Sequence, residues 1–415
     1  MWARRTLADA FSPRDNSFGF LRLFFAFLVL LSHTYPLGYG RDDPGAGITN
    51  GQAELGEIGI IGFFVISGFL ITRSGLRFGL GRFLWHRALR ILPGFWVCLA
   101  FTAFVLAPLV ALLERGNLRG FWSHSDGPVQ YVVKNLFVAM QQYGISDLLR
   151  DTPYAHRTGD SVFDGSLWSL MYEVGCYFMI GGLALVGVLK RAKVVVLVMA
   201  AAGFAVMVYD LIQAPHVPGP QGIHGPVFGF HGLDRYSLIY LTYLFLLGAV
   251  FELYKNRIVM NDAGAVLAVV VVVATVELGG VDVLGYPAFA YLILWSAIRL
   301  PKWLRGIGRR QDYSYGFYIY AFPVQQLLVL FGVPDWGLWT YALVATVGTF
   351  ALAVPSWHLV ERPAMRFKDW TPRWAQRTTA GDQASGMSTR EAPEPSAAAT
   401  QTSLAEGPSP ARGRP

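Results

Sequence analysis

Apolar stretches recur along nearly the whole 415-residue chain and are separated by short polar connections. A bilayer core about 30 Å thick is crossed by a helix of about 20 predominantly apolar residues. The pattern therefore predicts an all-α integral membrane protein with ten membrane-spanning helices. The predicted spans are 18–37, 57–72, 90–113, 166–188, 193–212, 236–253, 263–279, 283–299, 313–332 and 337–358.

Two parts of this pattern predict more than a simple crossing. The second span, 57–72, is short and rich in glycine, so we expect it to be broken, tilted or buried among its neighbours. The spans 263–279 and 283–299 are separated only by the sequence GGVD, which predicts a tight helical hairpin.

Lys and Arg gather in every second connection, whereas the alternate connections are acidic, neutral or mixed. Positive charge marks the cytoplasmic side, so both termini are expected there, in the cell inner (plasma) membrane. This divides the chain into a cytoplasmic segment 1–17, a membrane domain 18–368 and a cytoplasmic tail 369–415. The tail is rich in Ala, Ser, Thr, Pro and Gly, and is expected to be disordered. The first apolar stretch is too long for a signal peptide and is expected to be retained.

Composition excludes several classes of function. The chain is 53% hydrophobic and 15% charged, which is typical of membrane proteins, and its net charge of +7 lies in short loop clusters rather than on a nucleic-acid-binding face. Cys98 and Cys176 lie in apolar segments and are expected to be small core residues. His216, His224 and His231 do not have the spacing of a known metal site.

The connection 114–165 is the longest one predicted outside the cytoplasm, and it carries charges of both signs. Its apolar piece, Tyr131 to Met140, is too short to span a bilayer and is expected to be interfacial or re-entrant.

Arg22 and His33 are the two residues of the first span that do not belong in hydrocarbon. Eleven positions are close to three helical turns, so both side chains lie on one helix face, roughly 16 Å apart along the axis. Ionisable groups inside a span mark a functional pathway by default. Arg22 also fits a simpler interpretation, in which it extends to the nearby interface.

Arg87 and Arg90 are three positions apart, which places both guanidinium groups on one helix face just before Pro93. Guanidinium groups suit phosphate, so this face fits an anionic ligand that arrives from the cytoplasm. Ordinary positive-inside topology explains the same charges equally well.

Glu173 lies within the apolar run of the fourth predicted span. A carboxylate there is costly unless it is paired, and Arg22 or protonated His33 would be a natural partner. An interfacial position near the outer end of the span is the alternative. In the second span, Ser67 belongs to a set of small residues that favour close helix packing, and a nucleophilic role would need a nearby base.

Taken together, these motifs resemble the acyltransferase 3 family, whose polytopic membrane enzymes acylate cell-surface glycans and some secreted small molecules. The resemblance covers about residues 15 to 368 and ten spans. Its motifs stand in the family's order: Arg22-x10-His33, Gly62–Thr72, Arg87-x-x-Arg90, Gly165–Glu173, Asp312–Gln326 and Ser356–Pro363.

The resemblance implies an O-acyltransferase that transfers groups other than aminoacyl groups. Acyl-CoA, with acetyl expected, would be a donor substrate, no cofactor would be tightly bound, and Arg87 and Arg90 would contact the donor's phosphates. His33 would be a general base or a transient acyl carrier. Arg22 would stabilise the thioester oxygen or position the donor, and Glu173 would orient or charge-balance His33.

The acceptor implied by the family is a hydroxyl of an envelope glycan, exopolysaccharide or lipid-linked saccharide, with membrane lipids as surroundings and no nucleic acid. Many family members carry His where this chain has Ala321, so a role of that histidine does not apply here. A transporter or flippase of a glycan or small anion is the main alternative, because buried Arg, His and Glu also line substrate paths. The sequence shows no inverted repeat of its halves, which disfavours transport.

Overall fold

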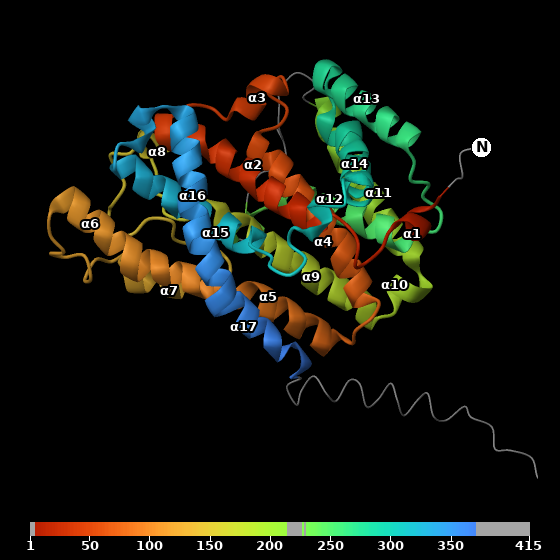
Figure 1. The fold of residues 1–415 in the computed structure, drawn as a ribbon, viewed down its shortest axis with the longest axis horizontal. Coiled ribbons are helices and arrows are strands. Elements are labelled where there is room, and N and C mark those ends of the chain that lie inside the picture. Colours follow the sequence, from red (N-terminus) through yellow and green to blue (C-terminus); the bar gives the residue numbers. More distant parts are fainter. Residues whose placement is uncertain (1–4, 214–225, 228–229, 371–415) are drawn as a thin grey trace, which may run out of the picture.

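The computed structural model describes residues 5–213, 226–227 and 230–370 as a bundle of helices (Figure 1). The α-helices are α1 Leu7–Ala10, α2 Phe18–Tyr39, α3 Pro44–Ile48, α4 Leu55–Gly75, α5 Leu80–Phe101, α6 Ala107–Arg115, α7 Pro128–Asn135, α8 Pro153–Thr158, α9 Leu170–Leu185, α10 Val188–Arg191, α11 Lys193–Gln213, α12 Arg235–Leu253, α13 Asp262–Leu278, α14 Tyr286–Arg299, α15 Ser314–Leu330, α16 Leu338–Ser356 and α17 Arg362–Met365. Two short antiparallel strands, β1 Pro226–Val227 and β2 Phe230–Asp234, precede α12.

Shorter helical turns connect several of these helices. Three are π-helical, at Thr102–Leu106, Val281–Gly285 and Trp357–Glu361. Four are 3-10 turns, at Gly165–Ser169, Leu304–Gly306, Val333–Trp336 and Arg366–Asp369.

Eight helical segments in the described part of the chain are long and apolar enough to cross a membrane, so the protein is a multi-pass membrane protein. They are Phe18–Tyr39, Leu55–Gly75, Leu80–Arg115, Gly165–Leu185, Lys193–Gln213, Arg235–Leu253, Val281–Arg299 and Leu338–Asp369. The two other predicted spans form helices of 17 residues each, α13 and α15.

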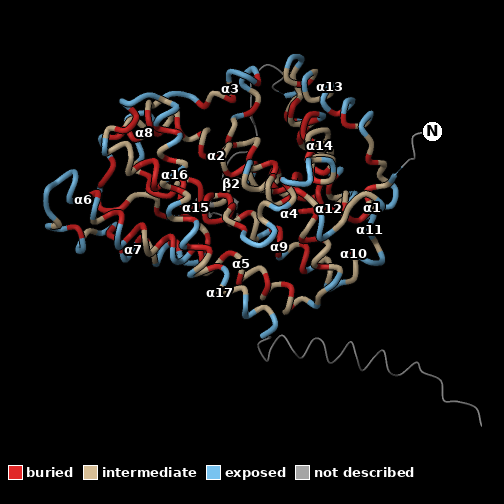
Figure 2. Tube along the Cα trace, viewed as in Figure 1, coloured by how far each residue is buried: buried red, intermediate tan, exposed pale blue. Residues whose placement is uncertain are grey.

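Helix α15 lies at the centre of the molecule. Every residue from Ser314 to Gln326 is buried, and α15 packs against α2, α5 and α16. Figure 2 shows buried residues concentrated in the middle of the bundle, where α2, α4, α12 and α15 meet. The outer helices instead expose apolar side chains, as α13 does at Val266, Leu267 and Val270, which suits a lipid-facing surface.

Two predicted boundaries differ from the structure. The third span was placed at 90–113, but its helix begins at Leu80 and continues through the π-helical turn to Arg115. Arg90 can enter the apolar bundle on this helix because it pairs with the buried carboxylate of Asp312, just before α15, and hydropathy does not reveal that contact. The second span forms an unbroken helix of 21 residues, so of the three expectations for it only burial is confirmed.

Glycine allows α4 and α12 to cross closely. A Cβ atom on Gly68 would lie 1.9 Å from the carbonyl oxygen of Phe245, and one on Gly248 would lie 2.1 Å from that of Val65. The backbones of α4 and α12 therefore approach each other where glycine leaves no side chain between them, as the small-residue pattern of the second span predicted.

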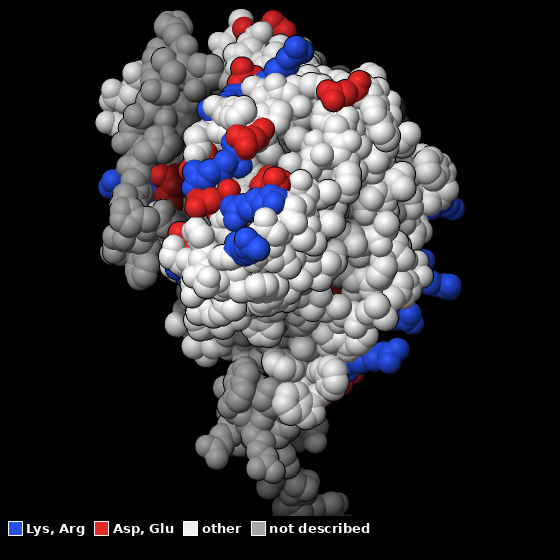
Figure 3. Space-filling model, turned by 90° about the vertical axis from the view of Figure 1, so that its left-hand side faces the viewer, with Lys and Arg blue, Asp and Glu red and all other residues white. Residues whose placement is uncertain are grey.

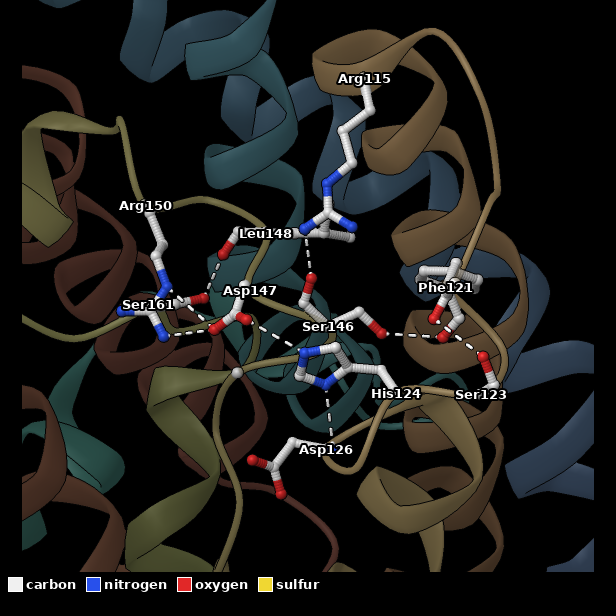
Figure 4. A network of polar contacts seen from close by, with 12 residues as sticks. Arg115, Phe121, Ser123, His124, Asp126, Ser146, Asp147, Leu148, Arg150 and Ser161 are labelled. Carbon is white, nitrogen blue, oxygen red and sulfur yellow. Dashed lines mark hydrogen bonds and ion pairs between the residues drawn. The ribbon is translucent and has the colours of Figure 1, made fainter.

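The connection 114–165 is held in place by a polar network (Figure 4). Asp147 accepts a hydrogen bond from Arg150 Nε at 3.0 Å and lies 3.0 Å from Nε2 of His124. Arg115, at the end of α6, donates to the backbone oxygen of Ser146. Figure 3 shows this side of the molecule, where charged side chains of both signs gather beside wide uncharged areas.

Helix α7 contains the first half of the predicted apolar piece, Tyr131 to Met140, of this connection. It has eight residues, and Val129, Val133 and Phe137 are 51%, 63% and 86% exposed on and just after it. A short helix with an exposed apolar face suits the membrane interface. The prediction that this piece does not span is confirmed.

Asp164 ties α7 to the start of the fourth span, because it accepts a hydrogen bond from the buried Tyr131 hydroxyl. Burial raises the pKa of Asp164 from 3.8 to about 7, although the hydrogen bond from Tyr131 opposes the shift. A carboxyl whose pKa is raised by folding stabilises the fold below pH 3.8, and this contribution is lost as pH rises through about 7.

Thermal unfolding of the wild type in detergent should therefore shift to lower temperature between pH 5 and pH 8, and Asp164→Asn should flatten this dependence. An unchanged pH profile in Asp164→Asn would contradict the assignment.

Several predictions from the sequence concern residues with little or no description. His216, His224 and the tail from residue 371 lie outside the described residues.

Cys98 and Cys176 are free and buried, which confirms their prediction as core residues. The hairpin of α13 and α14 is also confirmed, with left-handed Gly280 at its turn.

Candidate active site

Two cavities lie in the bundle between α2, α4 and α15. The first, which we call the arginine cavity, has a volume of about 100 Å³ and contains Arg22, Arg87, Arg90 and Glu173. The second, the histidine cavity, has a volume of about 440 Å³ and contains His33. The first predicted span therefore contributes Arg22 to one cavity and His33 to the other.

Arg22 and Arg90 share one carboxylate. Oδ2 of Asp312, just before α15, lies 3.1 Å from Arg22 and 2.6 Å from Arg90. Its other oxygen accepts a hydrogen bond of 2.6 Å from the hydroxyl of Ser314. Burial alone would raise the pKa of Asp312, but the two guanidinium groups and Ser314 lower it to about 2. Asp312 is therefore an anion at neutral pH and fixes both arginines.

Glu173 faces the same cavity from α9. Its Oε1 atom accepts hydrogen bonds of 2.6 Å from the hydroxyls of Ser67 on α4 and Tyr177 on α9. Ser67 thus has a carboxylate within hydrogen-bond distance, which the sequence could not reveal. Arg87 lines the cavity, and its buried Nε has no hydrogen-bond partner in the described structure. Of the two arginines predicted to contact the donor, Arg87 is the one that Asp312 does not hold.

His33 projects from α2 into the histidine cavity. Its ring packs edge-on against Phe322 of α15, with ring centroids 5.0 Å apart. Its Nδ1 atom is buried and has no hydrogen-bond partner within the described ranges. Asp43 lines the same cavity, where Ser32 and the backbone N–H groups of Gly45, Leu55 and Gly56 donate to its carboxylate.

The two cavities meet at Ile60 and Tyr318, which line both of them. The hydroxyl of Tyr318 donates to the backbone oxygen of Ser166 at 2.6 Å and lies 2.7 Å from the hydroxyl of Ser169. These contacts fix the tyrosine ring against the start of the fourth span. Among the residues that the structure describes, only these two are common to the walls of both cavities.

The structure brings together four of the five predicted site residues and leaves one apart. Arg22, Arg87, Arg90 and Glu173 line one cavity, and His33 lines the other. The sequence predicts that Glu173 orients His33, but no contact joins these two residues in the described structure. The hydrogen bonds of Glu173 come from Ser67 and Tyr177 instead. Asp43, Glu54 and Glu57 are instead the carboxylates that share a cavity with His33.

Sequence reasoning missed Asp312, Asp43 and Tyr318. Asp312 and Tyr318 lie in the motif Asp312–Gln326, but nothing in one sequence shows that this segment faces Arg22 and Arg90. Ala321 is buried one position before Phe322, the residue that packs on His33.

Comparisons with known proteins identify the family of this chain. A model of the acyltransferase domain matches residues 15–358. The chain belongs to the acyltransferase 3 family. As a member, it is an O-acetyltransferase-like enzyme.

Two relatives within this family have nearly the same length. Nodulation protein 10 of Rhizobium leguminosarum bv. viciae is 30% identical over 380 residues, which cover 86% of this chain and 95% of the relative. An O-acetyl transferase of Shigella phage Sf6 is 30% identical over 355 residues, which cover 84% of this chain and 96% of the relative. No solved structure matches the chain significantly.

Proposed function

We propose that this acyltransferase moves an acyl group, acetyl by the family's usual chemistry, from acyl-CoA to a hydroxyl of a cell-envelope glycan or exopolysaccharide. The observation that carries the proposal is the pair of cavities that meet at Ile60 and Tyr318. A cavity with arginines suits an anionic donor, and a larger cavity with a histidine suits an acceptor hydroxyl. The relative named as an O-acetyl transferase supports the acetyl group.

The proposed topology has ten crossings in the cell inner membrane, with both termini in the cytoplasm. Helices α13 and α15 supply the two crossings beyond the eight long ones, since 17 residues extend about 25 Å, near the lower end of what spans a bilayer. The arginine cavity then opens toward the cytoplasm, where acyl-CoA is available. The histidine cavity opens to the opposite side, where a glycan would arrive.

The donor is held in this proposal by Arg87 and Arg90, the predicted phosphate contacts. Arg87 has an unpartnered Nε, whereas Arg90 is already fixed by Asp312 and lies over the rings of Tyr315 and Trp357. Arg22 positions the thioester or stabilises charge on its oxygen as the carbonyl is attacked. No tightly bound cofactor is needed, because acyl transfer from a thioester requires no redox step.

The acceptor hydroxyl would be activated by His33. As a general base, His33 takes the hydroxyl proton while the oxygen attacks the thioester carbonyl, and the CoA thiolate leaves and is then protonated. As an acyl carrier, its ring nitrogen would attack the thioester and form an acyl-imidazole as the CoA thiolate leaves; the acceptor oxygen would then attack that acyl group, the imidazole would leave, and the hydroxyl proton would pass to it. Both routes require the acyl group to reach His33 past Ile60 and Tyr318.

Ile60 tests this passage. Ile60→Phe should lower acyl transfer by roughly 100-fold, because a larger side chain at the junction displaces the reacting groups and a misplacement of about 1 Å has effects of that size. The affinity for CoA should remain within a small factor of wild type. Ile60→Val is the matched control and should retain activity. Equal transfer rates in Ile60→Phe and wild type would exclude passage at this junction.

The function itself is tested in sealed vesicles that contain the full chain, with labelled acetyl-CoA supplied on the cytoplasmic face. We expect label in an extracted glycan or lipid-linked saccharide fraction from cells that make envelope glycans. No label with acetyl-, succinyl- or longer acyl-CoA, from folded protein offered a broad set of acceptors, would overturn the proposal in favour of transport.

A further inference from the structure

A basic groove lies next to the arginine cavity and is not explained by the site described so far. It has a volume of about 370 Å³, and four arginines line it: Arg14, Arg22, Arg305 and Arg309. Its lining contains no Asp or Glu. The groove lies where the segment before α2 meets the connection between α14 and α15.

The arginines of this groove differ in how they are held. Arg305 is fixed by an ion pair of 2.6 Å with Asp15 and by a hydrogen bond of 2.6 Å to the backbone oxygen of Ile298. Arg14 and Arg309 are exposed, and their guanidinium groups make no hydrogen bond or ion pair with the described residues. Two arginines therefore remain available for an anion beside a third that is held in place.

The groove adjoins the arginine cavity. Arg22 and Leu70 line both spaces. The wall between α2 and the connection before α15 is made by backbone, since a Cβ atom on Gly19 would lie 2.3 Å from the oxygen of Ile307. A wide basic space thus lies beside a narrower one whose lining combines arginines with apolar side chains.

We propose that the basic groove binds the 3′-phosphorylated nucleotide end of the CoA donor, through Arg14 and Arg309. This inference rests on the proposed acyl-CoA donor. A CoA molecule has a bulky, anionic nucleotide at one end and a slender, uncharged pantetheine arm at the other. The groove suits the anionic nucleotide, and the adjoining arginine cavity, which has both arginines and apolar side chains in its lining, suits the pyrophosphate and the arm that follows it.

A phosphate could also come from an anionic lipid headgroup. The lining that the two spaces share at Arg22 and Leu70 favours the nucleotide, because a bound CoA would have to extend from the groove into the arginine cavity. A headgroup needs no such continuation. The lipid composition of the test below separates the two sources.

The test measures binding of CoA and of dephospho-CoA, which lacks the 3′-phosphate, to the full chain in nanodiscs of phosphatidylcholine. The double variant Arg14→Ala/Arg309→Ala should raise the Kd for CoA by roughly tenfold or more, since hydrogen bonds between charged groups are being removed. Its Kd for dephospho-CoA should equal that of wild type. The control is Lys302→Ala/Arg257→Ala, which removes two exposed charges that do not line the groove and should leave both Kd values unchanged.

Each other outcome contradicts a specific part of the proposed binding of CoA. If the double variant binds CoA as wild type does, or weakens CoA and dephospho-CoA equally, the groove does not hold the 3′-phosphate. If the difference between the proteins appears only when phosphatidylglycerol is added, the groove binds lipid headgroups instead. If wild type binds neither nucleotide in any disc, the acyl-CoA donor of the proposed function fails as well.

Discussion

His33→Ala is expected to lower acyl transfer by roughly 100- to 10,000-fold, the range typical of a lost general base. His33 is the ionisable side chain that α2 places in the histidine cavity, and its ring is held against Phe322. Its position beyond the junction at Ile60 and Tyr318 lets it meet an acceptor while the donor remains in the arginine cavity. The affinity for CoA should stay close to wild type, because Arg22, Arg87 and Arg90 line the other cavity.

The measurement is labelled acetyl transfer in vesicles with matched amounts of folded protein. His156→Ala is a matched control, since its side chain is 67% exposed and does not line the histidine cavity. Transfer that persists unchanged in His33→Ala would remove this residue from the mechanism.

Rapid mixing of enzyme with donor, in the absence of acceptor, separates the two roles of His33. Label bound to wild-type protein and not to His33→Ala indicates an acyl carrier, and no bound label indicates a base.

Asp312→Ala is expected to destabilise the protein by about 3–5 kcal/mol, because removing one partner from a buried ion pair leaves uncompensated charge. Two guanidinium groups, those of Arg22 and Arg90, would lose the carboxylate that they share. The pKa of Asp312 is about 2, so its charge stabilises the fold above pH 3.8 and is lost only as pH falls through about 2. The loss of stability in the variant should therefore be the same throughout the neutral range.

The comparison is with Asp262→Ala, which breaks an ion pair of 3.0 Å with Arg299 in which both side chains are about half exposed. An exposed pair contributes about 0.2–1 kcal/mol, so this control should unfold close to wild type. Reversible unfolding in detergent or bicelles gives both values. Equal effects of the two substitutions would mean that Asp312 does not act as a buried counterion. Asp312→Glu, which retains the charge, should recover part of the stability.

These two expectations connect the fold to the chemistry. Asp312 holds Arg22 and Arg90 in one cavity, while α2 presents His33 to the other. A variant at Asp312 should therefore lose activity through stability and donor binding, and a variant at His33 should lose it with both intact.

The sequence by itself determined the features that depend on residues close to one another along the chain. Hydropathy summed over about 20 residues predicts a spanning helix, and every predicted span is present as a helix in the structure. The order of the motifs was sufficient to identify the family, and the match of the family model to residues 15–358 confirms that identification. The helical spacing of Arg22 and His33 also indicated that one helix carries two functional groups at different depths.

Only the tertiary structure decided which distant side chains share a cavity. Asp312 meets Arg22 and Arg90 because α15 passes through the centre of the bundle, beside α2 and α5. The same packing brings Glu173 to Ser67 rather than to His33. Such contacts depend on the register and crossing of helices far apart in the chain, and hydropathy carries no information about either. The apolar pattern therefore predicts which segments enter the membrane, and side-chain packing between them creates the site.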